Sequence, residues 1–99
     1  FMSLLNLHFR EQRRVTFYSD MLHITAKYLG TIVTQQTGHT VSEWIDRLVI
    51  SEAKVLLSSS SLTIQEITYK LNFPNQSFFC KYFKSHTGMT PSEFRSHGN

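Results

Sequence analysis

Side chains suited to hydrogen bonding with nucleic-acid bases are concentrated in one segment near the C-terminal end of the chain. On the outward face expected for residues 76–87, they are Gln76, Ser77, Cys80, Lys81 and Lys84. A glutamine amide can pair with adenine through two hydrogen bonds, a lysine can donate to guanine, and a serine can serve either base. We assign Lys84 to a phosphate or to support of the fold with equal weight. These side chains favour recognition of a nucleic acid over catalysis.

A similar face, with smaller side chains, is expected in residues 26–37. Its members are Ala26, Lys27, Gly30, Thr31 and Thr34. The methyl group of Ala26 or Thr31 can meet a thymine methyl, and Lys27 can reach a guanine or a phosphate. Lys27 is the only cation of this segment, so we expect its reading of bases to be weak or dominated by short-range contacts. Gly30 lowers the stability of a helix by roughly 0.5–1 kcal/mol relative to alanine.

Other kinds of site find little support in the residues. The five histidines show no ligand spacing with Cys80 or with acids, so neither zinc nor another cofactor is expected. No glycine-rich phosphate loop and no nucleophile elbow occurs, and we therefore expect no enzymatic activity. Cys80 is the single cysteine, which excludes an internal disulfide. An inert thiol is favoured over a redox sensor because no setting that lowers its pKa is visible.

Composition places the chain among small folded domains. Its 99 residues make one small domain, or two very small ones that share a core. Hydrophobic residues make up 40% and aromatic residues 13%, which is enough for a core and excludes general disorder. A net charge of +3 permits an anionic partner without requiring one. No apolar run approaches the roughly 18 residues that cross a bilayer, so we expect a cytoplasmic protein without membrane contact.

The elements that position these side chains are expected to be helices. Proline and glycine fall at the edges of segments whose apolar residues recur at helical spacing, which predicts an all-α fold. We predict seven helices, near residues 2–12, 17–22, 26–37, 41–59, 64–71, 76–87 and 91–96. Three capping boxes mark helix starts, and they are Thr40/Glu43, Thr63/Glu66 and Thr90/Glu93.

Further residues mark helix ends and turns. Thr16 and Thr25 are predicted to cap the second and third helices. Gly38 and Gly88 suit the left-handed conformation that commonly ends a helix. Asn72 tolerates the same conformation and is predicted to end the fifth helix.

One pattern occurs twice along the chain. Residues 17–38 and 64–88 each comprise a short helix, a tight turn, a longer helix and a Thr-Gly pair. This is the plan of a helix-turn-helix motif, whose second helix enters the major groove of DNA. Ordinary helical corners are the alternative, which two copies in so short a chain disfavour.

The segment between the two copies predicts how they are spaced. A helix over residues 41–59 would be about 28 Å long, and successive major-groove faces of B-DNA repeat every 34–36 Å or about one helical turn. We accordingly expect a first helix-turn-helix subdomain (1–40), a linker helix and loop (41–61) and a second subdomain (62–99). Each outer part has four cations against two acids, whereas the linker has two against three. Positive charge therefore follows the two repeated units.

Apolar side chains on the other helix faces are expected to form the core. Phe79, Phe83 and Tyr82 form an inward stripe with Phe78 at its margin. Base stacking by this stripe is the less favoured alternative. The residues expected to pack from 26–37 are Tyr28, Leu29, Ile32 and Val33. Those expected to anchor the linker helix are Trp44, Ile45, Leu48, Leu56 and Leu57.

The C-terminal third also carries a family resemblance. Residues 64–95 (IQEITYKLNFPNQSFFCKYFKSHTGMTPSEFR) resemble the second helix-turn-helix and the signature of AraC-type bacterial transcription regulators. The residues that carry it are Ile64, Ile67, Asn72, Phe73, Ser77, Phe79, Phe83, Lys84, Gly88 and the Thr90-Pro91-x-x-Phe94-Arg95 ending. Residues 17–38 resemble the first helix-turn-helix, and 44–57 the linker helix. The departures from the common pattern are Asn72 for Gly, Thr68 for Ala, Val49 for Arg, and Gly30-Thr31 for polar or basic residues.

The resemblance implies sequence-specific double-stranded DNA binding by a transcription regulator. It implies that helices 26–37 and 76–87 enter consecutive major grooves, while Lys and Arg side chains and helix N-termini hold phosphates. It further implies an effector-sensing or signalling region before residue 1 and, for an activator, contact with RNA polymerase. The chain does not begin with Met, and we expect a domain excised from a longer protein. The alternative is a helical protein–protein interaction module that does not bind DNA.

Overall fold

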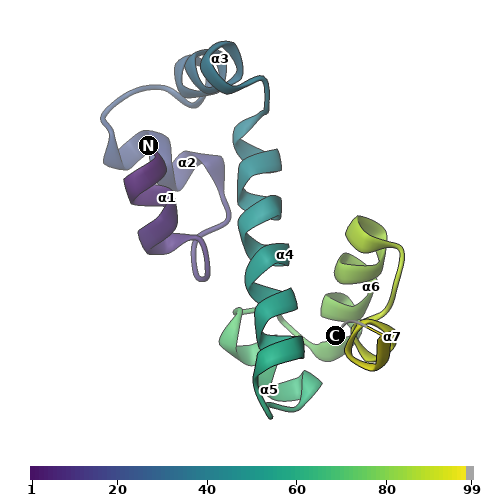
Figure 1. The fold of residues 1–99 in the computed structure, drawn as a ribbon. Helices are drawn as coiled ribbons and strands as arrows, with labels where there is room; N and C mark the ends of the chain where they lie inside the picture. Colours follow the sequence, from purple (N-terminus) through teal and green to yellow (C-terminus); the bar gives the residue numbers. More distant parts are fainter. Residues whose placement is uncertain (98–99) are drawn as a thin grey trace. The chain divides into compact units, whose positions relative to one another are not determined.

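The computed structural model describes residues 1–97, and its regular elements are seven α-helices (Figure 1). They are α1 (Met2–His8), α2 (Val15–Met21), α3 (Ala26–Thr37), α4 (Val41–Ser59), α5 (Ile64–Lys70), α6 (Gln76–Thr87) and α7 (Pro91–His97). No strand occurs in this described range. The predicted all-α fold is therefore confirmed.

The helices α3, α4 and α6 begin and end at the predicted residues. Thr25 caps α3 as predicted, because its hydroxyl accepts a hydrogen bond from the Tyr28 amide at 3.1 Å. Gly38 and Gly88 follow α3 and α6 with φ angles of 80° and 83°. Glycine adopts this left-handed conformation at little steric cost, which is why both helices end there.

The first helix is shorter than predicted. It ends at His8, and the amides of Glu11 and Gln12 both donate to the His8 carbonyl in the turn that follows. The Tyr18 hydroxyl then donates to the Gln12 carbonyl at 2.6 Å. This hydrogen bond joins α2 to the turn that follows α1.

The second helix begins two residues earlier than predicted. Its N-cap is Arg14, whose φ and ψ of −89° and 132° are extended, and the Phe17 amide already donates to the Arg14 carbonyl. Thr16 is therefore inside the first turn, and the prediction that it caps the helix is wrong. Its carbonyl accepts instead from the Ser19 hydroxyl at 3.1 Å.

All three predicted capping boxes form. In each, the threonine hydroxyl accepts from the glutamate amide at 3.1–3.2 Å, and the glutamate carboxylate accepts from the threonine amide at 2.7–2.8 Å. The hydrogen bond from the Thr40 amide lowers the pKa of Glu43, and that from Thr90 lowers the pKa of Glu93. These carboxylates are therefore ionised at neutral pH, as the positive end of a helix dipole favours.

The chain divides between Leu48 and Val49 into two compact units. We call residues 1–48 the N-terminal unit and the described residues 49–97 the C-terminal unit. The 19-residue helix α4 runs without interruption through this boundary, so each unit contains one part of it. The predicted division into three parts, with residues 41–61 as a separate linker, stays a prediction.

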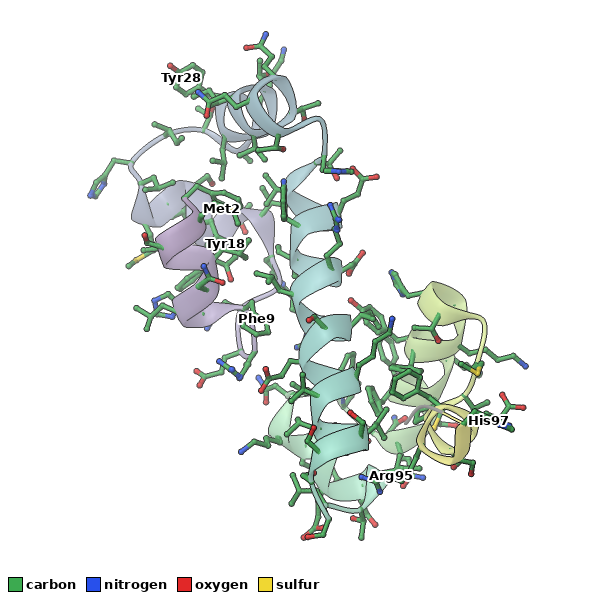
Figure 2. All side chains as sticks on the ribbon, viewed as in Figure 1. Met2, Phe9, Tyr18, Tyr28, Arg95 and His97 are labelled. Carbon is green, nitrogen blue, oxygen red and sulfur yellow. The ribbon has the colours of Figure 1, made fainter. Side chains whose placement is uncertain are left out.

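In the N-terminal unit, α2 packs against α3 around a small apolar core. Its buried side chains are Leu5, Phe9, Tyr18, Leu29, Val33, Val41 and Ile45. Tyr18 is fully buried, and its burial raises the pKa of the phenol. Ile32 is half-buried, whereas Tyr28 is 56% exposed, so the prediction that Tyr28 packs in this core is wrong. Figure 2 shows its side chain pointing out from α3.

In the C-terminal unit, α6 packs against α5 and α7 around a core of aromatic rings. Phe79 and Phe83 are fully buried, and Tyr82 is half-buried, which confirms the inward stripe. Phe73, from the turn before α6, lies with its ring centroid 5.1 Å from that of Phe79. Phe78 is 52% exposed, in agreement with its predicted place at the margin.

Helix α4 supplies a wall of the core to each unit. Ile45 and Leu57 are buried as predicted, whereas Trp44, Leu48 and Leu56 are half-buried. The sequence prediction missed further buried positions, which are Val41, Val49, Ile50 and Ala53. Full burial of Val49 explains why an apolar side chain stands there, because an uncompensated arginine at this depth would cost several kcal/mol.

Candidate nucleic-acid interface

Each unit contains a short helix and a longer one joined by the same turn. The Leu22 amide donates to the Tyr18 carbonyl at 3.1 Å, and Ile24 donates to Ser19 at 3.0 Å. The second unit repeats these bonds forty-nine positions later, from Leu71 to Ile67 and from Phe73 to Thr68, both at 3.0 Å.

One residue of each turn is left-handed. His23 has a φ of 59° and Asn72 a φ of 64°. The structure confirms the prediction for Asn72, but His23 was missed. The signal was available, because the repeat aligns Leu22-His23 with Leu71-Asn72.

The longer helix of each unit begins at a side-chain cap. Asn75 Oδ1 accepts from the Phe78 amide at 2.8 Å, as Thr25 does from Tyr28 in the first unit. Pro74 adds one residue before this cap, so the equivalent positions of α3 and α6 differ by fifty rather than forty-nine. The helix-turn-helix arrangement predicted from the sequence is therefore present twice.

Six of the ten predicted contact residues lie on matching outward faces of α3 and α6. Leu29 and Val33 face the core of one unit, and Phe79 and Phe83 face the core of the other. Helical periodicity then places three predicted positions of each helix opposite the core, where all are exposed: Lys27, Thr31, Thr34, Ser77, Lys81 and Lys84. Gly30 and Cys80 flank this face and are half-buried. Ala26 and Gln76 stand at the first helical position, on the side of the core residues three and seven positions later, where Ala26 is half-buried and Gln76 is exposed.

The outward face of α3 has small side chains and few free hydrogen-bond donors. The Thr31 hydroxyl donates to the Lys27 carbonyl at 3.0 Å, so its proton is used within the helix. A Cβ atom built on Gly30 would meet no heavy atom within 4 Å apart from its helix neighbours. The surface around Gly30 is therefore open, and nothing in the folded chain requires a glycine there.

Replacing Gly30 with alanine should stabilise the fold. The new methyl group has room, and alanine loses less backbone entropy than glycine in a helix, so we expect a gain of roughly 0.5–1 kcal/mol. For a domain of this size that is a rise in Tm of about 2–8 °C, measurable by circular dichroism. A fall in Tm would show that the glycine is needed for packing.

Cys80 has the environment of an unreactive thiol. It is half-buried on the flank of α6, and desolvation raises the pKa of its thiol. The thiolate is the reactive form of cysteine, so a raised pKa disfavours redox chemistry at neutral pH. This agrees with the inert thiol favoured from the sequence.

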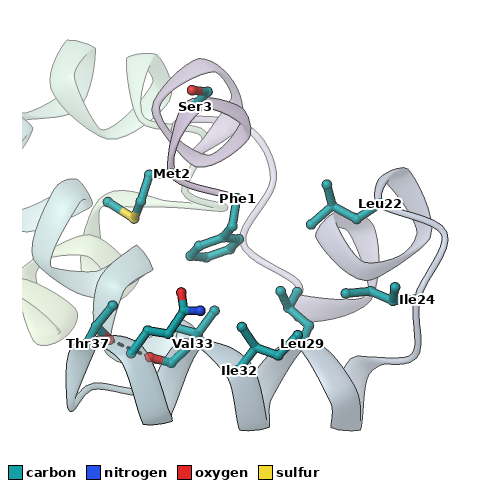
Figure 3. Close-up of a pocket in the computed structure, with 10 residues that line it drawn as sticks. Phe1, Met2, Ser3, Leu22, Ile24, Leu29, Ile32, Val33 and Thr37 are labelled. Carbon is teal, nitrogen blue, oxygen red and sulfur yellow. Dashed lines mark hydrogen bonds between the residues drawn. The ribbon is translucent and has the colours of Figure 1, made fainter.

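An apolar groove lies on a different side of α3. It has a volume of about 510 Å³ and is lined by Phe1, Met2, Ser3, Leu22, Ile24, Leu29, Ile32, Val33, Gln36 and Thr37. Figure 3 shows the Phe1 ring between α1 and the row of apolar side chains on α3. The groove contains none of the predicted contact residues, so it is separate from the outward face.

Two exposed aromatic rings border the outward faces and were not predicted to do so. Tyr28 and Phe78 occupy equivalent positions, each three residues after its cap, and are 56% and 52% exposed. Tyr28 was assigned to packing from its residue type. The available signal was its alignment with Phe78, which the sequence already placed at a margin.

Two other kinds of site find no support in residues 1–97. Within this part of the chain, no cluster of three or more His, Cys, Asp or Glu side chains is arranged to hold a metal ion. The described helices also include none that is both long and apolar enough to span a bilayer.

Helices α3 and α6 are each capped by a side chain, and each follows a short helix and the same kind of turn. This arrangement defines the class of helix-turn-helix proteins. The family described as "Helix-turn-helix domain" matches residues 18–97. The chain is 36% identical over 78 residues to the uncharacterized transcriptional regulatory protein YesN of Bacillus subtilis, covering 77% of this chain and 21% of that one. It is 38% identical over 68 residues to the arabinose operon regulatory protein of Escherichia coli, covering 69% and 23%.

The fold is also found in a solved DNA complex. The DNA-binding domain of the global transcriptional factor AdpA, solved with a target DNA, superimposes with a TM-score of 0.86 at 18% identity, covering 97% of this chain and 86% of that one. The chain belongs to the AraC-type family of helix-turn-helix DNA-binding domains. It spans about a fifth of the length of the YesN and arabinose relatives.

Proposed function

We propose that this chain is the part of a transcription regulator that binds double-stranded DNA in a sequence-specific manner. The observation that carries the proposal is the repeated helix-turn-helix arrangement, in which two capped helices of matching register each present an exposed outward face, with hydrogen-bonding side chains concentrated on α6. Side chains of this kind on a recognition helix can reach base edges in the major groove. The solved DNA complex of AdpA, which has the same fold, supports this assignment.

In the proposed mechanism, α3 and α6 enter consecutive major grooves. The uninterrupted helix α4 has 19 residues, a length of about 28 Å that is comparable to the groove repeat of about 34–36 Å. One chain would then bind an asymmetric site with two half-contacts about one helical turn apart. Exposed lysine and arginine side chains, together with the free amides at the starts of α3 and α6, would hold phosphates.

The proposal extends to the longer protein from which such a domain comes. We propose an effector-sensing or signalling region before residue 1, because the curated relatives are several times longer than this chain. If the protein is an activator, RNA polymerase is a further partner. The proposed role is regulatory rather than enzymatic, and it places the protein in the cytoplasm, where bacterial chromosomal DNA lies.

Lys81→Ala and Gln76→Ala should each weaken binding to the cognate duplex by about 1–3 kcal/mol. Both side chains are exposed on α6, and each loss should relax the preference for particular bases. The measurement is the Kd of cognate and scrambled duplexes, after selection of bound sequences from a random pool. Equal losses on both duplexes would instead assign the residue to a phosphate.

Lys70→Ala is the matched control for Lys81→Ala. It removes the same charge from an exposed position at the end of α5, outside the two outward faces. We expect it to leave the ratio of cognate to scrambled affinity unchanged. A changed ratio would show that the loss of any nearby charge alters specificity. The effect of Lys81→Ala could then not be assigned to a contact with a base.

The alternative, a helical protein-interaction module, is favoured by one observation, the apolar groove beside α3. The two functions differ in their response to salt. Binding to duplex DNA weakens steeply as salt rises, because released counterions drive it, whereas an apolar contact is little affected. No measurable affinity for any duplex at low salt would favour the alternative.

A further inference from the structure

The outward faces of α3 and α6 can be compared position by position. Both helices have twelve residues, both follow a side-chain cap, and both are followed by a left-handed glycine. The fifty-residue register aligns the pairs Ala26/Gln76, Lys27/Ser77, Gly30/Cys80, Thr31/Lys81 and Thr34/Lys84. The two helices therefore match in length, cap and end, and their aligned positions differ in side chains.

The face of α3 has little means to distinguish bases by hydrogen bonding. Ala26 and Gly30 have no polar side-chain atom, and the Thr31 proton is donated to the Lys27 carbonyl. Donors that remain are the flexible Lys27 ammonium and the Thr34 hydroxyl, which lies in the third turn. Lys27 is thus the one directed donor near the start of α3, and no neighbouring amide side chain supports it in reading a base.

The face of α6 is equipped at the same positions with side chains that discriminate. Gln76, at the first helical position, offers an amide that can donate and accept at once, in place of Ala26. Lys81 stands in place of Thr31 and Ser77 in place of Lys27, and both are exposed. Base reading depends on such directed groups near the start of the recognition helix.

We propose that α6 sets the sequence preference of this chain, whereas α3 enters its groove with little preference among sequences. This inference rests on the proposed function. In this proposal, Gln76 and Lys81 are the principal specificity-determining residues. The N-terminal unit contributes chiefly affinity for DNA of any sequence.

The position of Arg14 in the N-terminal unit agrees with a role in sequence-independent affinity. Arg14 is exposed at the N-cap of α2, which is the first helix of its helix-turn-helix motif. The first helix of such a motif crosses the DNA backbone, so a cation at its start is placed for a phosphate. Its counterpart at the start of α5 is Thr63, which is uncharged and used in a capping box. In the C-terminal unit, the exposed cations Lys81 and Lys84 lie on α6 rather than at the start of α5.

The test is a map of base preference for the 99-residue chain. Bound duplexes are selected from a random pool, and Kd is then measured for every single-base change in the selected site at fixed salt. The positions whose preference relaxes in Lys81→Ala are those read by α6. There we expect unfavourable bases to weaken binding roughly tenfold or more. One helical turn away, we expect changes of less than about threefold for α3.

Arg14→Ala provides an independent readout of the N-terminal unit. We expect it to weaken binding to all duplexes by the same factor and to reduce the salt-dependence slope by about one. A loss confined to the selected site would contradict the assignment of Arg14 to a phosphate and would overturn this part of the proposal.

Placing side chains of α6 at the equivalent positions of α3 tests whether these side chains cause the difference in base preference. The variant Ala26→Gln/Thr31→Lys should sharpen preference at the α3 positions by about fivefold or more, with an unchanged helical signal in circular dichroism. Equally sharp preference at both half-contacts in the unmodified chain, or no sharpening in a folded variant, would overturn the division between α3 and α6. Absence of any salt-dependent duplex binding would instead refute the proposed function.

Discussion

Replacing Phe79 with alanine should lower the free energy of unfolding by about 3–5 kcal/mol. Phe79 is fully buried on α6, with its ring centroid 5.1 Å from Phe73 and 6.0 Å from Phe83. Removing the ring leaves a cavity between Phe73 of the turn and Phe83 of α6, because closely packed neighbours can close the space only in part. The loss approaches the entire stability of many small domains.

Thermal and urea unfolding followed by circular dichroism measure this effect. In a domain of this size, each kcal/mol corresponds to about 4–8 °C in Tm, so a fall of about 12 °C or more is expected. Phe78→Ala is the matched control, since it removes the same side chain from the neighbouring position, where it is 52% exposed. We expect a much smaller loss there. Similar losses in the two variants would contradict the packing role of Phe79.

The parts of the fold that local chemistry determines were predictable from the sequence. A threonine hydroxyl and a glutamate three residues later satisfy each other's amides without help from distant residues, so all three capping boxes formed as predicted. The same is true of Gly38 and Gly88, whose left-handed conformation depends on the absence of a side chain. Helix periodicity then sufficed to predict the exposed positions opposite the core, such as Thr31 on α3 and Lys81 on α6.

Features that depend on tertiary contacts were not predictable. The first helix ends at His8 rather than near residue 12, and Tyr28 of α3 is 56% exposed rather than packed in the core. The end of α1 has no signal in the local sequence, whereas the exposure of Tyr28 is indicated only by comparison with Phe78 in the second repeat. The exposure of Lys27, Thr31 and Lys81 could be predicted because it needs only a helix face, whereas their contact with DNA stays a prediction.

Arg95 shows how a charge count can mislead. It was included among the cations of the second subdomain, whose charge favoured DNA binding. In the structure its Nε donates to the Leu57 carbonyl at 2.9 Å, and Nη2 lies 3.4 and 3.5 Å from the carbonyls of Leu56 and Ser60. Arg95 therefore interacts with the C-terminal end of α4, where unpaired carbonyls and the negative end of the helix dipole favour a cation.

Arg95→Ala should destabilise the fold by about 1.5–3 kcal/mol, because it leaves partly buried carbonyls without a charged donor. Arg95→Lys should recover only part of this loss, since a lysine lacks the planar fork that reaches several carbonyls at once. Urea unfolding of the two variants measures the difference.

DNA binding separates this structural role from a phosphate contact. If Arg95 held a phosphate, its removal would reduce the salt-dependence slope by about one, as expected for Arg14. Because the guanidinium is directed at α4, we expect the slope to stay unchanged at temperatures where the variant is folded. A reduced slope with unchanged stability would refute the structural role and return Arg95 to the DNA interface.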